Sequence, residues 1–143
     1  MKKQILYSLV LAFTTVLFSC TKADKDQLSP VISSESFSPE NCDIYYPEDT
    51  ITVHFVCTDD KELGNFNIEI HSNFDHHTHS TSSADCDHHD DEENEEHDTT
   101  NAWVYNQDFS IPSGLTSYTP NISIGIPLDI ATGTYHFMIR LTD

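Results

Sequence analysis

Basic residues are scarce in this 143-residue chain: six Lys and Arg side chains face 24 Asp and Glu side chains, and the formal net charge is −18 at pH 7. A surface with this charge repels phosphate backbones and anionic lipid headgroups, and it attracts cations. The shortage of basic residues therefore excludes nucleic acid as a partner, and it leaves no polybasic patch for binding to a membrane surface.

Glycine is also rare, with four residues in the chain, and the common catalytic motifs are missing. The sequence has no Gly-x-Ser-x-Gly nucleophile elbow, no His-Glu-x-x-His zinc motif and no glycine-rich phosphate loop. We therefore predict that the protein is not an enzyme. A hydrolytic zinc site stays open as an alternative, because a free coordination position leaves no trace in a sequence.

One long hydrophobic run extends over residues 5–17 and follows Lys2 and Lys3. The run is too short to span a bilayer, and it has the charge and length of a signal peptide. Leu17-Phe18-Ser19-Cys20 comes next and resembles the lipobox of bacterial lipoproteins, in which the cysteine accepts the lipid. An ordinary secretory signal is the alternative, and both readings place the mature chain outside the cytoplasm. We predict a lipoprotein signal peptide at residues 1–19 and a lipid anchor, such as palmitate, on Cys20.

Residues 20–29 are polar and lack periodicity up to Pro30, so they are expected to form a flexible tether behind the lipidated cysteine. Once residues 1–19 are removed, four Lys and Arg side chains remain against all 24 carboxylates, which gives a formal charge of −20. The predicted location is the outer membrane, and both the cell surface and the periplasmic face stay open.

The rest of the chain, residues 30–143, shows the two-residue alternation of half-buried strands. Ile51, Val53, Phe55 and Cys57 alternate with more polar residues, and Pro and Gly separate the segments. This pattern predicts one domain with an all-β, antiparallel, immunoglobulin-like β-sandwich. The expected strands are 50–58, 66–71, 103–111, 121–126 and 135–141.

Residues 72–100 interrupt the strand pattern with a His-rich and acidic segment. Within it, residues 85–98 hold nine carboxylates and three histidines but no Lys or Arg. Such a segment buries too little apolar area to offset its ordering entropy, so we predict a loop insertion. The acidic run lacks the Asp-x-Asp-x-Asp-Gly geometry of a calcium loop, and charge runs of this kind are usually solvated.

Histidines point to a transition metal site at one end of the sandwich. If the strands ending at His71 and beginning at His136 are antiparallel neighbours, both imidazoles point away from the core at the same place. The loop would then add further ligands, and nitrogen ligands suit zinc or copper better than calcium or magnesium. The predicted metal ligands are His71, Asp75, His76, His77, His79 and His136. The alternative is solvated surface histidines, which is how we interpret His54.

Two motifs are specific enough to support a resemblance: the run from His71 to His79, with its Phe-Asp-His-His core, and Tyr135-His136-Phe137. Together with residues 63–64, 111–115 and 138–143, they resemble a family of bacterial lipoproteins that carry one domain of unknown function. The resemblance implies an immunoglobulin-like fold over nearly all of residues 30–143 and supports the histidine positions, but it implies no activity. Members of that family continue past Asp143 into a final strand, so this chain is expected to lack the last strand.

Three cysteines remain after Cys20 is assigned to the lipid, and an odd number cannot all pair within one chain. The alternation places Cys57 on the core-facing side, as a buried thiol. Cys42 and Cys86 lie in loops, so we predict a disulfide between them. A role for Cys86 as a soft metal ligand beside His88 and His89 is the alternative.

Two functions from different classes follow from these features. One is a membrane-anchored, extracytoplasmic lipoprotein that binds zinc or copper through the histidine cluster, with an outer-membrane uptake system as its expected protein partner. The other is an adhesive or scaffolding immunoglobulin-like surface module without a metal function. The fold favours neither, because immunoglobulin-like domains have many unrelated roles.

Overall fold

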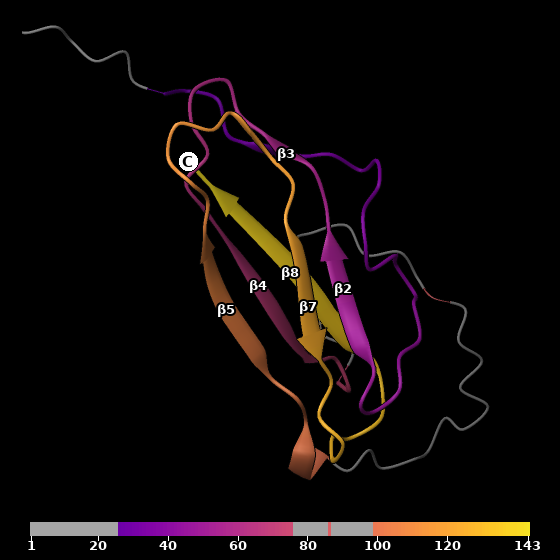
Figure 1. Ribbon diagram of the computed structural model, residues 1–143. Coiled ribbons are helices and arrows are strands. Elements are labelled where there is room, and N and C mark those ends of the chain that lie inside the picture. Colours follow the sequence, from indigo (N-terminus) through magenta and orange to yellow (C-terminus); the bar gives the residue numbers. More distant parts are fainter. Residues whose placement is uncertain (1–25, 76–85, 87–98) are drawn as a thin grey trace, which may run out of the picture.

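The computed structural model describes residues 26–75, 86 and 99–143 and shows an all-β chain in this part of the sequence (Figure 1). The one helical element among these residues is a three-residue 3₁₀ turn, and none of their helices is long and apolar enough to cross a membrane. The elements in chain order are β1 Val31–Ile32, β2 Thr50–His54, β3 Cys57–Thr58, β4 Asn65–Ser72, η1 Thr99–Asn101, β5 Tyr105–Ser110, β6 Ser117–Tyr118, β7 Asn121–Gly125 and β8 Tyr135–Thr142.

The strands pair antiparallel throughout and form a β-sandwich-like arrangement. One sheet has the order β5-β4-β8, and the pair β2-β7 and the short sheet β1-β3-β6 complete the fold. Figure 1 shows β2 and β7 crossing in front of the sheet that contains β4 and β8. The predicted all-β antiparallel fold is therefore confirmed.

The core lies where alternate residues of the two layers meet. Val53, Phe55 and Cys57 are fully buried on one side, and Phe66 and Ile68 meet them from β4. The rings of Phe55 and Phe66 pack edge to face with centroids 5.4 Å apart. Burial of each large apolar side chain contributes about 1.5–3 kcal/mol, so this alternation fixes which face of β4 is turned outward.

The predicted strand at 50–58 is divided in the structure. Residues of β2 pair with β7, whereas β3 pairs with β1 and β6, so the chain changes partners at Phe55 and Val56. The burial alternation continues across this break, because Phe55 and Cys57 are both fully buried. Sequence alternation therefore predicted the buried face correctly and missed the change of sheet partner.

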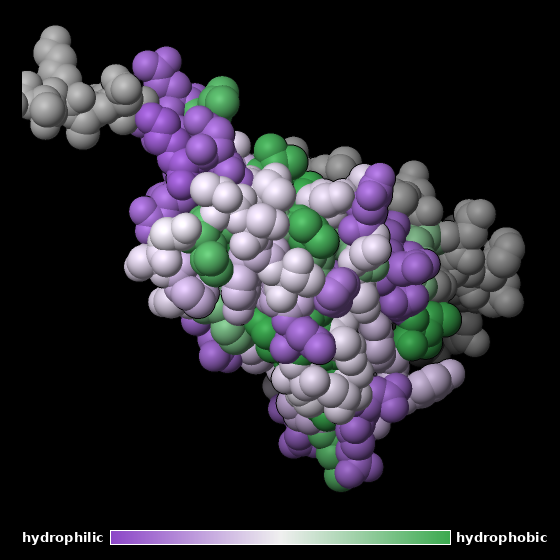
Figure 2. All heavy atoms as spheres, turned by 45° about the horizontal axis from the view of Figure 1, so that its top comes forward, coloured by the Kyte–Doolittle hydropathy of each residue, from purple (hydrophilic) through white to green (hydrophobic). Residues whose placement is uncertain are grey.

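The two ends of the sandwich differ in what they carry. β4 ends and β8 begins at the same end, because their antiparallel register pairs Ser72 with Tyr135. The opposite end holds Asp26, where the described chain begins, close to Asp143. Figure 2, in which that end comes forward, shows hydrophilic surface next to the start of the described chain.

Candidate metal centre

His71 and His136 lie directly opposite each other on β4 and β8. Ile70 and Phe137, the residues next to them, pack into the core, so the two imidazoles project from the outer face of the sheet. Their ring centroids are 5.5 Å apart with an interplanar angle of 54°, and the His71 side chain is 19% exposed. Two strands thus hold two imidazoles side by side at the surface.

Glu69 stands behind His71 on the same face of β4. One carboxylate oxygen, Oε1, lies 3.1 Å from Nδ1 of His71, and the other accepts a hydrogen bond from Arg140. The hydrogen bond from Arg140 is the main reason that the pKa of Glu69 is lowered, although burial opposes it; the charges of Arg140 and His71 add to the lowering. Glu69 is therefore a stable anion at neutral pH.

The contact between Glu69 and His71 determines which imidazole nitrogen can bind a metal. The Nδ1 atom is shielded from water, and Glu69 Oε1 lies 3.1 Å from it. A carboxylate at Nδ1 favours the tautomer with the proton on that atom, which makes Nε2 the ligand nitrogen. A carboxylate behind a histidine ligand is the usual support of a metal-bound imidazole.

The chain that leaves β4 is held against the start of β8. The backbone N–H of Asn73 donates to the carbonyl of Thr134 at 2.8 Å, and the ring of Phe74 packs edge to face on Tyr135 with centroids 5.3 Å apart. Gly133 leaves the space for this ring, since a Cβ atom there would lie 2.5 Å from Phe74. The exposed Asp75 follows directly, so the predicted His-rich loop starts from a fixed point.

Gly133→Ala is expected to destabilise the domain by about 1–3 kcal/mol, because it combines a clash with Phe74 and a φ of +145° that L residues rarely adopt. Gly114→Ala is the matched control, since Gly114 also has a positive φ, +82°, but no atom lies within 4 Å of its added Cβ. Urea unfolding of both variants measures the difference. Equal losses would show that Phe74 moves aside without cost.

The remaining predicted site residues fall into two groups. His76, His77, His79 and the lipidation site Cys20 lie outside the described residues. Cys42 and Cys86 form a disulfide with a Cα–Cα distance of 5.5 Å, so the sulfur of Cys86 is not a thiolate ligand. Cys57 is a buried free thiol that donates to the carbonyl of Tyr118, and burial raises the pKa of that thiol.

Within the described part of the chain, the histidine pair supplies two candidate ligands of a metal centre. There, His71 and His136 belong to no group of three His, Cys, Asp or Glu residues whose ligand atoms all lie within 4.8 Å of one another. A three- or four-ligand metal centre would therefore need further donors, and the residues that follow Asp75 in sequence are histidines. The sequence had indicated His71 and His136 but not Arg140, whose contact with Glu69 depends on the strand register.

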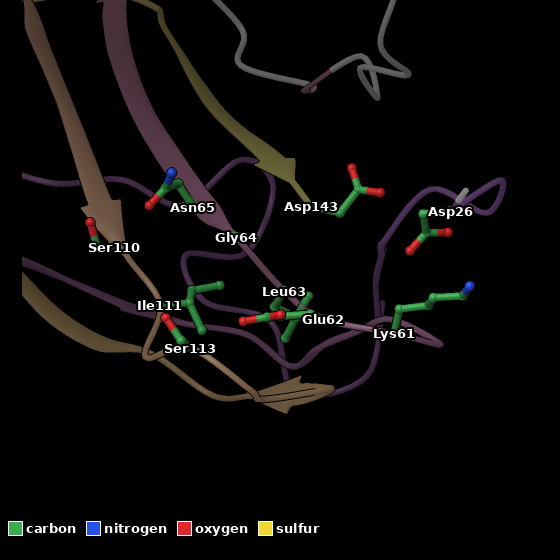
Figure 3. Close-up of a pocket in the computed structure, with 10 residues that line it drawn as sticks. All are labelled: Asp26, Lys61, Glu62, Leu63, Gly64, Asn65, Ser110, Ile111, Ser113 and Asp143. Atoms are coloured by element: carbon green, nitrogen blue, oxygen red, sulfur yellow. The ribbon is translucent and has the colours of Figure 1, made fainter. Parts of the chain in front are cut away.

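A second cluster of possible ligands lies at the opposite end of the sandwich. Carboxylate oxygens of Asp26, Asp59 and Asp143 lie within 4.8 Å of one another. Figure 3 shows Asp26 and Asp143 among the residues that line a pocket at this end. Asp26 and Asp143 are exposed, and Lys61 lies beside Asp26 in the same pocket. Exposed carboxylates gather readily on so acidic a chain, so we assign no ion to this cluster. Sequence reasoning missed it because the three residues come from distant parts of the chain.

Comparison with known families places the chain in a family. The model of a family described as a domain of unknown function (DUF4625) matches residues 18–143. No curated protein and no solved structure matches the chain. The match covers the whole of the described fold and assigns no activity to the histidine pair.

Proposed function

Because the chain belongs to the DUF4625 family, whose domain has no assigned function, we propose from its own residues that it is an exported, lipid-anchored protein that binds zinc or copper. The observation that carries this proposal is the pairing of His71 with His136 across β4 and β8, with Glu69 behind His71. Both imidazoles are fixed by strands, so little conformational entropy is lost when they bind an ion.

The donor atoms decide the class of ion. Imidazole nitrogen suits zinc and copper, whereas calcium and magnesium prefer sets of oxygen ligands. His76, His77 and His79 follow β4 closely in sequence, and we propose that one or two of them complete the site, with Asp75 as a ligand or as a hydrogen-bond acceptor. Because Cys86 is in a disulfide, its sulfur is not a thiolate, and histidine nitrogen is the donor of this region that suits zinc or copper.

The direction of β8 supports a site that faces away from the membrane. The histidine pair lies at the start of β8, and Asp26 approaches Asp143 just past its other end. A strand rises about 3.4 Å per residue, so His136 and Thr142 are roughly 20 Å apart. In an immunoglobulin-like domain tethered through Cys20, the site would be displayed outward, where an uptake system or another partner can reach it.

Metal analysis of the mature chain, purified without a His tag, tests the proposal. We expect one tightly bound zinc or copper ion per chain, and weaker binding when the pH is lowered from about 7.5 to about 5.5, because only neutral imidazole binds metal. Calorimetry with calcium and magnesium is the control for the acidic residues. A protein that takes up no zinc or copper at the higher pH contradicts the metal function.

A scaffolding or adhesive module is the second candidate, and one observation favours it. The apolar side chains of Ile44, Tyr46 and Leu128 are 67%, 69% and 67% exposed. Large exposed apolar side chains of this kind can contact a protein partner. This function would leave the histidine pair without a metal, so the same metal analysis separates the two candidates.

The membrane anchor makes a separate prediction. Cys20→Ser is expected to abolish labelling with palmitate and to leave the precursor uncleaved, because the serine hydroxyl does not replace the thiol that accepts the lipid. The measurement is metabolic labelling followed by separation of precursor and mature forms, with Cys57→Ser as a control that retains the lipobox. Continued labelling of the Cys20→Ser variant would disprove the lipid anchor.

A further inference from the structure

The outer face of the sheet β5-β4-β8 carries a connected row of polar side chains. Asn67, two residues before Glu69, donates from Nδ2 to Asn106 and to Asp108, both at 2.8 Å. Arg140, opposite Asn67 on β8, donates from Nη1 to Asn67 at 3.4 Å and also to Glu69. The row therefore runs from β5 through Asn67 and Arg140 to Glu69, which contacts His71.

Strand register explains why Arg140 reaches Glu69. The residues directly opposite Glu69 are Met138 on β8 and Asn106 on β5, and neither carries a charge. Arg140 lies one step diagonally away on the same face, a separation that long side chains bridge. Its side chain is 56% exposed, so the ion pair itself adds little to stability. The contribution of Arg140 is therefore to the geometry of Glu69 rather than to stability.

The two carboxylate oxygens of Glu69 contact two different neighbours. Arg140 donates a hydrogen bond to Oε2, and Oε1 therefore points toward Nδ1 of His71. Without the arginine, Glu69 would lose the contact that fixes Oε2, and its side chain could adopt rotamers that point the carboxylate away from His71 toward solvent. The orientation of Glu69 is then set by Arg140, which is itself held by Asn67.

We propose that Arg140 is a positioning residue for the histidine pair: by holding Glu69, it keeps the proton of His71 on Nδ1 and presents Nε2 to a metal ion. The inference rests on the proposed function for the identity of the ligand. The tautomer, however, is a property of the metal-free protein. The tautomer is measured without any ion, so the role of Arg140 and the proposed metal function can be disproved independently.

The experiment is nitrogen NMR of the imidazoles in the metal-free mature chain, at a pH where histidine is neutral. We expect His71 to be mainly Nδ1–H in the wild type and in Arg140→Lys, which keeps a charged donor nitrogen. Arg140→Met keeps the apolar stem and loses the donor, so His71 should shift toward Nε2–H. Lys61→Met is the matched control, because it makes the same loss of charge at the opposite end of the sandwich.

Glu69→Gln provides a second route if Arg140→Met does not fold. An amide has one oxygen, which would accept the hydrogen bond from Arg140. The amide N–H would then point at Nδ1 of His71, and an acceptor Nδ1 requires the proton to be on Nε2. The inference is overturned if the wild type is mainly Nε2–H, or if neither Arg140→Met nor Glu69→Gln moves the tautomer.

Zinc titration is the second readout. Loss of a carboxylate that directly contacts a histidine ligand weakens metal binding by about 10–100-fold, and we expect a smaller loss of zinc affinity for Arg140→Met. A tautomer shift without zinc binding disproves the metal function alone.

Discussion

Replacing His71 and His136 together by alanine is expected to remove the tight metal site and to weaken zinc or copper binding by about 100-fold or more. Zinc sites with four ligands bind with about 10–16 kcal/mol, and each 1.4 kcal/mol corresponds to a factor of ten. Both strand-fixed donors would be lost at once. Because both side chains project from the outer face of the sheet, the core is unchanged and the domain should still fold.

Calorimetry of the untagged double variant at about pH 7.5 measures this loss, and weak binding by the acidic residues 85–98 should persist. His54→Ala is the matched control: His54 lies on β2, paired with Asn121, and the structure gives it no place in the histidine pair. If zinc and copper bind the double variant as tightly as the wild type, the strand-anchored site does not exist. The scaffolding function then becomes the better explanation.

The long strands of this fold could be predicted from the sequence because each has one solvent-facing side and one side that packs on the core. In β4, Phe66, Ile68 and Ile70 are buried and alternate with polar residues, so the strand predicted at 66–71 matches Asn65–Ser72. The strands predicted at 121–126 and 135–141 likewise match β7 and β8. Burial on one face fixes both the strand and its orientation, since a slip of one residue would expose the whole apolar set.

The short and exposed elements were not readable in the same way. β1 and β6 have two residues each, which is too few to show any alternation. The strand predicted at 103–111 begins later, at Tyr105, and its residues 106–108 are all exposed, so burial does not alternate along the middle of β5. Where burial does not alternate, the ends of a strand depend on tertiary contacts.

The same distinction between local pattern and tertiary contact applies to the candidate site. That His71 and His136 face outward follows from alternation within each strand, whereas their adjacency needed an assumption about topology; the structure pairs the two strands directly. The role of Arg140 depends on a diagonal contact that only the register reveals. Local periodicity therefore predicts on which face of the sheet a side chain lies. The register between strands determines which of the outward side chains are in contact.

Removing the bridge between Cys42 and Cys86 is expected to cost about 4 kcal/mol of stability. The bridge closes a loop with a sequence separation of 44, and in the chain-entropy model such a crosslink restricts the unfolded state by that amount. Domains of this size have a free energy of unfolding of about 5–15 kcal/mol, so the loss would leave a marginal fold. Urea unfolding of the Cys42→Ser, Cys86→Ser double variant measures it.

The same loss should follow reduction of the wild type, because Cys57 is the free, buried cysteine among the described residues and takes no part in a bridge. Peptide mapping of the non-reduced chain should find Cys42 joined to Cys86, with Cys57 alkylated only after unfolding. The histidine pair does not depend on this bridge, since β4 and β8 are joined by their own ladder from Asn65 to Ser72. A double-cysteine variant within about 1 kcal/mol of the wild type would show that the unfolded chain is already compact there, so that the crosslink removes little entropy.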